Sequence, residues 1–240
     1  MDGSCKIKCM LLSTSQMSSY HSLSLRTMQL SAEGKDLERV KSTKLLGIHL
    51  NENLKWVDHV KHLASSCYGT LACLKKIKNF TPYKLRKQLA ESLILSHLDF
   101  SDAVFYPLTE HVLKRLQWKQ YSAASFVTGR YTNSIGSIFK IGWLPMRESR
   151  DWHLLKTAHK ALYSSTWPQS LQLERVKHSR TLRSSSTVNL VIPLISNTFQ
   201  DSAAILFNSL PVKIKSCVDA RTFSRETYEF LRNRSNNNDN

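Results

Sequence analysis

The chain has 240 residues, of which 41% are hydrophobic and 22% are charged, with only 7 glycines and 6 prolines. This composition excludes a low-complexity or disordered polypeptide, and the length suffices for a sizeable apolar core without disulfides or a structural metal. Lysine and arginine number 34 against 18 aspartates and glutamates, giving a formal net charge of +16. Such an excess predicts a polyanionic partner, nucleic acid first and an anionic membrane surface second; a basic surface without such a partner is the alternative.

Targeting signals and cysteine usage bear on the compartment. No apolar run approaches the roughly 18 to 20 residues of a membrane span, and the N-terminus lacks the apolar segment of a signal peptide. Five cysteines at irregular spacing do not form a secreted disulfide framework, so reduced thiols are expected. The sequence therefore predicts an intracellular protein, nuclear or cytoplasmic, that is not secreted and has no membrane partner.

Extended segments are expected near the N-terminus. Alternating and apolar patterns predict strands over residues 6–12, 27–32 and 40–50. A serine-rich loop over 13–24 and a hairpin turn over 33–36 connect them. Gly47, inside the third expected strand, indicates a bulge or a close approach of another backbone.

From residue 51 onward, apolar residues recur at three- and four-residue steps, which is typical of amphipathic helices. A stripe from Val57 to Leu74 predicts a helix of about five turns, and Pro82 begins a second helix with Leu85, Leu89 and Leu93 on one face. Further helices are expected over 110–127 with Gly129 as C-cap, after Pro145, over 199–210 and over 223–232. The remaining segments are a loop over 164–187, a short strand over 188–195 and a disordered tail from Ser235.

The expected fold class is α+β and mostly α-helical. A small antiparallel strand region, residues 1–52, precedes a helical bundle, residues 53–129. A second, mostly helical lobe follows over residues 130–234, and residues 235–240 form the tail.

A strongly basic window lies between Asp58 and Glu91, where no acidic residue occurs. Its cations lie around a helix end and the following loop, with two aromatic residues between them, so phosphates could be tracked and a base or sugar could pack on a ring. The alternative is a solvated helix end whose lysines complement the helix dipole. The candidate nucleic-acid-binding residues are Lys61, Lys75, Lys76, Lys78, Phe80, Tyr83, Lys84, Arg86 and Lys87.

Neither a metal centre nor an active site is expected from the residue pattern. The histidines and cysteines do not pair at the spacing of a zinc site, and no phosphate-binding glycine loop, G-x-S-x-G or HExxH motif occurs. Asp99 and Asp102 are the only close aspartate pair, and the favoured interpretation is that their side chains stabilise a turn or cap a helix. The sequence therefore predicts no catalytic residues, no metal and no cofactor.

Several motifs in fixed order carry a family resemblance. They are K-C-M-L-L-S, V-K-S-T-K-L-L-G-I-H-L-N-E-N-L-K-W, S-L-I-L-S-H-L-D-F, L-K-R-L-Q, A-A-S-F-V-T-G, I-G-W-L-P-M-R-E-S-R, H-L-L-K-T-A-H-K-A-L-Y and L-F-N-S-L-P-V-K-I-K. Together they span about residues 6 to 231. In this order they resemble the C-terminal part of the reverse transcriptase of jockey-like non-LTR retrotransposons.

The resemblance implies the last palm strands in residues 1–52 and a thumb-like bundle in residues 53–129. Leu45, Leu46, Gly47 and Ile48 would match the hairpin that grips the primer strand near its 3′ end. The thumb of that family closes on the template-primer duplex, which fits the basic window. Phe100-Ser101 departs from the family, whose members usually have Tyr-Cys after the Leu-Asp.

The catalytic aspartates of the family's palm lie upstream of the part that this chain resembles, and the endonuclease domain is likewise absent. Without carboxylate-held metal ions polymerisation cannot proceed, so this chain alone is expected not to be an enzyme. The expected function is that of a reverse transcriptase fragment that at most binds template-primer nucleic acid without sequence preference. Its partners would be an RNA/DNA hybrid or duplex DNA, and the missing polymerase core. The alternative is an inert helical protein-interaction module or a transposon relic without function.

Overall fold

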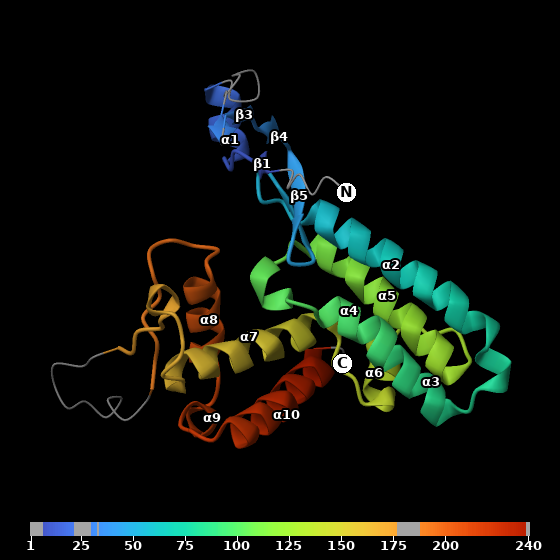
Figure 1. The fold of residues 1–240 in the computed structure, drawn as a ribbon. Coiled ribbons are helices and arrows are strands. Elements are labelled where there is room, and N and C mark those ends of the chain that lie inside the picture. The colour runs from blue at the N-terminus through green and yellow to red at the C-terminus, as the bar shows by residue number, and fades with distance from the viewer. Residues whose placement is uncertain (1–6, 22–29, 33, 177–187, 239–240) are drawn as a thin grey trace, which may run out of the picture. The chain divides into compact units, whose positions relative to one another are not determined.

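A computed structural model of the chain describes residues 7–21, 30–32, 34–176 and 188–238 (Figure 1). The chain divides into two compact units, Met1–Ser65 and Ser66–Asn240. Short strands characterise the first unit and helices make up most of the second, so the expected α+β, mostly α-helical class is confirmed. The second unit includes residues 66–129 of the expected helical bundle together with the expected C-terminal lobe, whereas residues 53–65 of the expected bundle belong to the first unit.

The N-terminal unit is built from paired short strands. The pairs are β1 (Lys8–Cys9) with β4 (Glu38–Arg39), β2 (Ser31–Ala32) with β3 (Lys35–Asp36), and β5 (Ser42–Leu45) with β6 (Ile48–Asn51). The last two pairs are antiparallel as expected, whereas β1 and β4 run parallel. The serine-rich segment, expected to be a loop, contains helix α1 (Ser15–Tyr20) because the Thr14 hydroxyl accepts a hydrogen bond from the Met17 backbone N–H.

The expected third strand is wrong as a single strand, because residues 42–51 fold back on themselves as the β5–β6 hairpin. Leu46 and Gly47 form its two-residue turn, with φ angles of 47° and 90°. Tight hairpin turns need positive φ at both central residues, which glycine adopts without steric cost. Gly47 therefore marks a turn and not a bulge. The first expected strand is confined to β1, and residues 27–29 of the second lie outside the described residues.

Helix α2 (Val57–Lys76) runs across the boundary between the units. The elements after it are η1 (Lys78–Phe80), α3 (Tyr83–Ala90), η2 (Glu91–Leu95), α4 (Ser96–Asp99), η3 (Asp102–Phe105), α5 (Glu110–Thr128), α6 (Ile135–Ile141), α7 (Met146–Tyr163), η4 (Gln169–Leu171), α8 (Phe199–Asn208), α9 (Val212–Lys215) and α10 (Ala220–Asn238). Local end signals act as expected: Gly129 caps α5 in the left-handed region with φ 78°, and Pro82 directly precedes α3.

The apolar core of the C-terminal part lies where α7 meets α8, α9 and α10 (Figure 1). Leu155 of α7, Phe207 of α8, Ile214 of α9 and Phe223 of α10 are all buried there. Each helix contributes one apolar face to this cluster. Burial of these faces is the main source of stability for the four helices, because isolated helices of this length are marginally stable in water.

The buried faces of α2 and α3 differ in how well they match the expectation. On α2 the stripe through Cys67, Leu71 and Leu74 is buried. Along α3 and η2 the expected apolar face is largely wrong, because Leu85 of α3 and Leu93 of η2 are 41% and 39% exposed. The π-helical segment η2 has a wider turn than an α-helix and rotates the faces that follow it. Burial falls instead on residues of α3, η2 and α4: Ala90, Ile94 and Leu98.

Two expectations near the C-terminus are also wrong. Residues 188–195 do not form a strand beyond a single bridge between Leu190 and Arg175, because the Asn208 amide hydrogen-bonds both the N–H and the carbonyl of Leu190. The tail from Ser235 is helical as far as Asn238, where α10 ends. A hydrogen-bonded ion pair between Arg234 and Asp151 fixes this end of α10 against α7.

Candidate nucleic-acid interface

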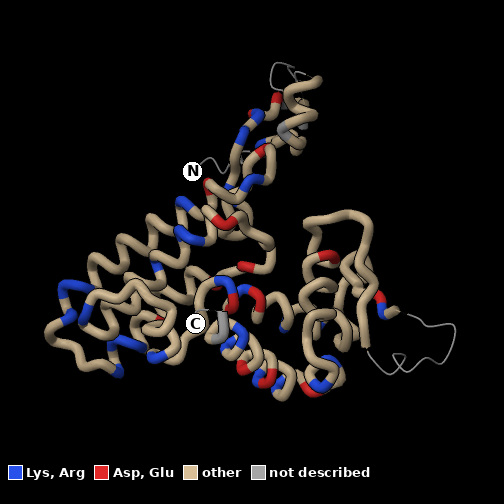
Figure 2. Tube along the Cα trace, turned by 180° about the vertical axis from the view of Figure 1, so that it is seen from behind, with Lys and Arg blue, Asp and Glu red and all other residues tan. Residues whose placement is uncertain are grey.

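The segment from Lys75 to Lys87 forms a basic ridge that covers the end of α2, the η1 turn and the start of α3. Figure 2 shows lysine and arginine gathered along this part of the tube, without acidic residues between them. The turn is stabilised locally, since the Thr81 hydroxyl donates to the Ile77 carbonyl and the Arg86 N–H donates to the Pro82 carbonyl. The sequence window thus folds into one continuous surface feature.

Two of the ridge cations are directed to the C-terminus of α5. The Lys78 Nζ donates to the Gly129 carbonyl at 2.9 Å, and the Arg86 Nη1 donates to the Phe126 carbonyl at 3.3 Å. The last carbonyls of a helix lack intrahelical donors and carry partial negative charge, so cations at this position stabilise the helix. The helix-end interpretation therefore applies to Lys78 and Arg86, although the helix they complement is α5.

Lys87 is countered by an acidic neighbour on the next turn. Its Nζ lies 3.8 Å from Glu91 Oε1, which also accepts a hydrogen bond at 2.8 Å from the Trp143 indole N–H. The Trp143 ring is buried, so Glu91 is held in place and part of the Lys87 charge is neutralised. Lys87 is consequently a weaker candidate for phosphate contact than the sequence indicated.

The remaining ridge cations, Lys75, Lys76 and Lys84, form an open set. All three are exposed, and none has a carboxylate within ion-pair distance among the described residues. Phe80 is 86% exposed and Tyr83 is 47% exposed between them. Exposed rings between unpaired lysines can contact sugars and bases while the lysines contact phosphates.

Lys61 belongs to the N-terminal unit and is not part of the ridge. It lines a cavity of about 490 Å³ together with residues of β5, β6 and α2, among them Asp58 and two histidines. The rings of His49 and His62 stack at 4.0 Å there. Burial, His62 and Lys44 lower the pKa of His49.

The four residues of the primer-grip-like set occupy the β5–β6 turn. Leu45 and Leu46 are 57% and 88% exposed at the tip, whereas Ile48 is buried. The turn geometry alone accounts for glycine at position 47, so the close approach of a sugar-phosphate backbone is not needed to explain it. Two exposed leucines at a hairpin tip nevertheless present an apolar contact surface.

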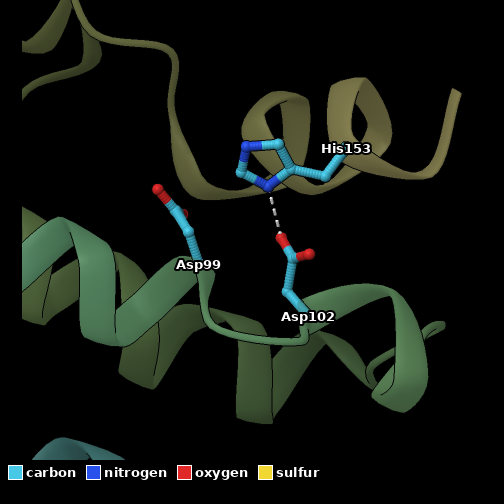
Figure 3. A group of neighbouring side chains, drawn as sticks. All are labelled: Asp99, Asp102 and His153. Atoms are coloured by element: carbon cyan, nitrogen blue, oxygen red, sulfur yellow. Dashed lines mark hydrogen bonds and ion pairs between the residues drawn. The ribbon is translucent and has the colours of Figure 1, made fainter. Parts of the chain in front are cut away.

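Asp99 and Asp102, the close aspartate pair of the sequence, form a cluster with His153, which the sequence did not indicate. Asp99 at the end of α4 and Asp102 at the start of η3 both point toward α7, which carries His153 (Figure 3). One potential ligand atom from each residue lies within 4.8 Å of the others, and His153 Nδ1 is 2.7 Å from Asp102 Oδ2. Turn and cap duty is thus not the main role of Asp102, because its carboxylate pairs with a helix 51 residues away.

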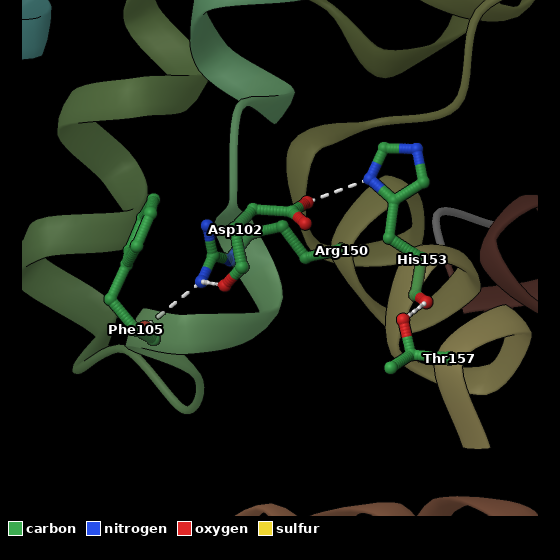
Figure 4. Close-up of polar contacts among 5 residues, drawn as sticks. All are labelled: Asp102, Phe105, Arg150, His153 and Thr157. Atoms are coloured by element: carbon green, nitrogen blue, oxygen red, sulfur yellow. Dashed lines mark hydrogen bonds and ion pairs between the residues drawn. The ribbon is translucent and has the colours of Figure 1, made fainter. Parts of the chain in front are cut away.

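A buried arginine beside this cluster bears on whether the cluster can bind a cation. Arg150 is 2% exposed, and its Nη2 donates to the carbonyls of Asp102 and Phe105 at 2.9 and 3.0 Å (Figure 4). Its guanidinium also lies 4.5 Å from the Phe105 ring centroid. Carboxylate and imidazole donors suit a divalent cation, but the Arg150 charge and the His153–Asp102 pair oppose one. We assign this cluster a structural role, joining α4 and η3 to α7.

Ionisation in the cluster is shifted by its surroundings. The pKa of Asp99 is raised to about 6, mainly by burial; His153 opposes this shift and the Asp102 charge adds to it. Burial and the Asp151 carboxylate raise the pKa of Tyr106, whose hydroxyl donates to Asp151 at 2.8 Å. The close spacing of Asp99 and Asp102 was one sequence signal for this network, and the charged pair Arg150 and Asp151 within α7, both buried, was another.

Within the described residues, every helix is too short or too polar to traverse a lipid bilayer. Comparisons with models of protein families, with curated proteins and with solved structures found no match to this chain.

Proposed function

We propose that this chain binds double-stranded nucleic acid without sequence preference, as the palm-end and thumb part of a non-LTR reverse transcriptase. The observation that carries the proposal is the open set of Lys75, Lys76 and Lys84, interleaved with the exposed rings of Phe80 and Tyr83. The order of motifs that resembles the jockey-like family supports it, as does the exposed tip of the β5–β6 hairpin.

The ridge would contact phosphates and sugars, which positions a duplex without reading its bases. An RNA/DNA hybrid and duplex DNA are both suitable ligands, since both present a dense row of phosphates. In the resembled family the catalytic aspartates lie in the upstream palm, so we assign binding and not polymerisation to this chain, with no cofactor of its own. Its place of action would be the nucleus or the cytoplasm, and a polymerase core would be a further partner.

A charge-matched pair of triple variants tests the proposal. Lys75→Ser/Lys76→Ser/Lys84→Ser removes the open set, and Lys55→Ser/Lys114→Ser/Lys213→Ser removes three exposed lysines elsewhere. Binding of a labelled RNA/DNA hybrid is measured by fluorescence anisotropy over a range of salt concentrations. The slope of log K against log salt is negative, and each lost phosphate contact makes it shallower by about 0.9, so the slope for the ridge triple is expected to be shallower by about 2 to 3.

The control triple is expected to change that slope by less than about 1, because its lysines make no direct phosphate contact in this proposal. Equal slopes for wild type and the ridge triple would overturn the proposal. An equal change of slope in the two triple variants would also overturn it, because binding would then depend on net charge and not on the ridge.

A second candidate function is favoured by a group of exposed apolar residues between 191 and 195. Val191 and Ile192 are 43% and 52% exposed, Ile195 is 73% exposed and Leu194 is fully exposed. A surface of this kind is typical of a protein-interaction module, here one that would self-associate in isolation. Concentration-dependent mass in light scattering, abolished by Leu194→Ser/Ile195→Ser, is expected. A monodisperse monomer at all concentrations would count against this function.

A further inference from the structure

The loop that follows α5 packs directly against the basic ridge. Lys78 donates to the Gly129 carbonyl, and the end of α5 thus lies beside the turn between α2 and α3 (Figure 1). Arg86 donates to the Phe126 carbonyl in the last turn of the same helix. A Cβ atom at Gly129 would lie 3.1 Å from Arg86 Nη1 and 3.7 Å from Lys78 Cε, so the two segments are in close contact there. The chain after Gly129 therefore starts at the ridge itself.

The open set of lysines lies close to these two contacts. Lys75 and Lys76 come three and two residues before Lys78, at the end of α2. Lys84 comes two residues before Arg86 in α3. Two or three helical residues advance the chain by only about 3 to 5 Å. All three open lysines are thus near the end of α5 and the loop that follows it.

Arg130 and Tyr131 in this loop are exposed, Tyr131 to 79%. The backbone on both sides of the pair is bonded to the last turn of α5. The Thr128 hydroxyl accepts a hydrogen bond from the Arg130 N–H at 3.4 Å, and the Ser125 hydroxyl accepts one from the Thr132 N–H at 2.9 Å. The loop therefore presents these two side chains to solvent from a fixed backbone position, which lowers the entropy that a ligand contact would cost.

The loop adds positive charge to the ridge without adding a carboxylate. Residues 111–147 contain no aspartate or glutamate, as is also true of the window between Asp58 and Glu91. Arg130 has no carboxylate within ion-pair distance among the described residues. Two acid-free segments that are far apart in sequence thus meet at Gly129 and form one cationic surface, with exposed rings from both.

We propose that Arg130 and Tyr131 form the second half of the duplex-binding surface. The Arg130 guanidinium would bind a phosphate, and the Tyr131 ring would pack on a neighbouring sugar of the same duplex that the open set binds. A guanidinium suits this contact because its N–H groups match two phosphate oxygens at once. The inference rests on the proposed function for its ligand, and it adds a segment that the basic window of the sequence does not contain.

The test uses the full chain and a labelled RNA/DNA hybrid of 15 base pairs, with fluorescence anisotropy over a range of salt concentrations. Arg130→Ser removes the guanidinium, Arg130→Lys retains the charge, and Tyr131→Ala removes the ring. The matched controls are Arg221→Ser at the start of α10 and Tyr20→Ala in α1, where both side chains are exposed. Urea unfolding establishes that each variant is folded.

Arg130→Ser is expected to make the slope of log K against log salt shallower by about 0.9, and Arg130→Lys is expected to retain the slope, because the slope counts phosphate contacts. Tyr131→Ala is expected to weaken binding about threefold or more at an unchanged slope, because a ring releases no counterion. The two controls are expected to change affinity by less than about twofold. Arg130→Ser added to the ridge triple is expected to make the slope shallower by about 3 to 4 in all.

A wild-type slope in Arg130→Ser would overturn the inference, as would a loss of affinity in Tyr131→Ala no greater than in Tyr20→Ala. Two duplexes bound per chain at saturation would also overturn it, because the loop and the ridge would then be separate sites. If the ridge triple has a shallower slope but Arg130→Ser does not, the proposed function stands and only the loop is excluded from it. An unchanged slope in the ridge triple is instead the failure of the proposed function.

Discussion

The Lys78 ammonium group on η1 donates a hydrogen bond of 2.9 Å to the carbonyl oxygen of Gly129, 51 residues further along the chain. This contact converts a lysine of the basic window into a cap for α5. Arg86 acts on the same helix end through the Phe126 carbonyl. The ridge thus contains cations of two kinds, those that stabilise the fold and those that remain open to a ligand.

Substitution separates these two kinds of cation. Lys78→Met is expected to lower the free energy of unfolding by about 1 to 2 kcal/mol, because it leaves a helix-end carbonyl without its charged donor. Lys76→Met, which removes an exposed lysine, is expected to change stability by less than about 0.5 kcal/mol and to weaken duplex binding severalfold. Urea unfolding and fluorescence anisotropy measure the two effects. A loss of binding without a loss of stability in Lys78→Met would contradict the assignment.

Arg150→Met is expected to destabilise the chain by about 3 kcal/mol or more, since it leaves the carbonyls of Asp102 and Phe105 without their charged donor and removes a buried positive charge near the Asp102 carboxylate. Arg147→Met on the same helix is the matched control. Arg147 pairs with Glu110, but both side chains are more than half exposed, so a loss below about 1 kcal/mol is expected. Thermal unfolding of the two variants makes the comparison, and similar losses in both would refute the structural role of Arg150.

Asp99 predicts a pH dependence with a definite sign. Burial raises its pKa to about 6, above the value of an unfolded aspartate, so folding favours the protonated form. The stability from this group is present below about pH 4 and is lost as the pH rises through 6. Asp99→Asn is therefore expected to be more stable than wild type at pH 8, by up to about 2 to 3 kcal/mol, with the gain shrinking toward pH 4. Urea unfolding at pH 4, 6 and 8 measures this.

Asp219 supplies the control of opposite sign. Hydrogen bonds from Thr222 at the start of α10 lower its pKa, so its contribution is present at neutral pH and is lost as the pH falls. Asp219→Asn is expected to be less stable than wild type at pH 8. A gain in Asp99→Asn that does not vary with pH would show that the carboxyl is not buried as described.

Two cysteines of α2 test the packing of that helix. Cys67 is fully buried and burial raises its pKa to about 11, whereas Cys73 is exposed. The thiolate is the reactive form, so Cys73 is expected to react with a thiol reagent and Cys67 to be protected until the chain unfolds. Alkylation followed by peptide mass spectrometry, with and without denaturant, gives the two rates. Equal labelling in the native protein would mean that the buried face of α2 is assigned wrongly.

Features governed by neighbours in sequence were predictable. The end of α5 at Gly129 and the start of α3 after Pro82 follow from the backbone conformations that these residues favour. The mostly helical class follows from apolar periodicity. The single strand expected over 40–50 failed because Gly47 is equally compatible with a bulge and with a two-residue turn, and pairing of β5 with β6 decides between them.

Features governed by partners far along the chain were not predictable from residue type. The helical end of α10 is one such case, because the asparagine-rich segment is helical where Arg234 pairs with Asp151 of α7. Weak local propensity is readily overridden by such contacts. The pairing of Asp102 with His153 is another, since no spacing rule connects a turn with a helix 51 residues away.

By itself the sequence determined that the chain is basic, mostly helical and marked by one acid-free window, because charge count, apolar periodicity and glycine and proline signals are local properties. Only the tertiary structure decided which cations of that window remain available. Lys78 and Arg86 are bound to α5 and Lys87 to Glu91, whereas Lys75, Lys76 and Lys84 stay open. The physical reason is that a helix end brought from 40 to 51 residues away supplies carbonyls that compete with any ligand for the same donors.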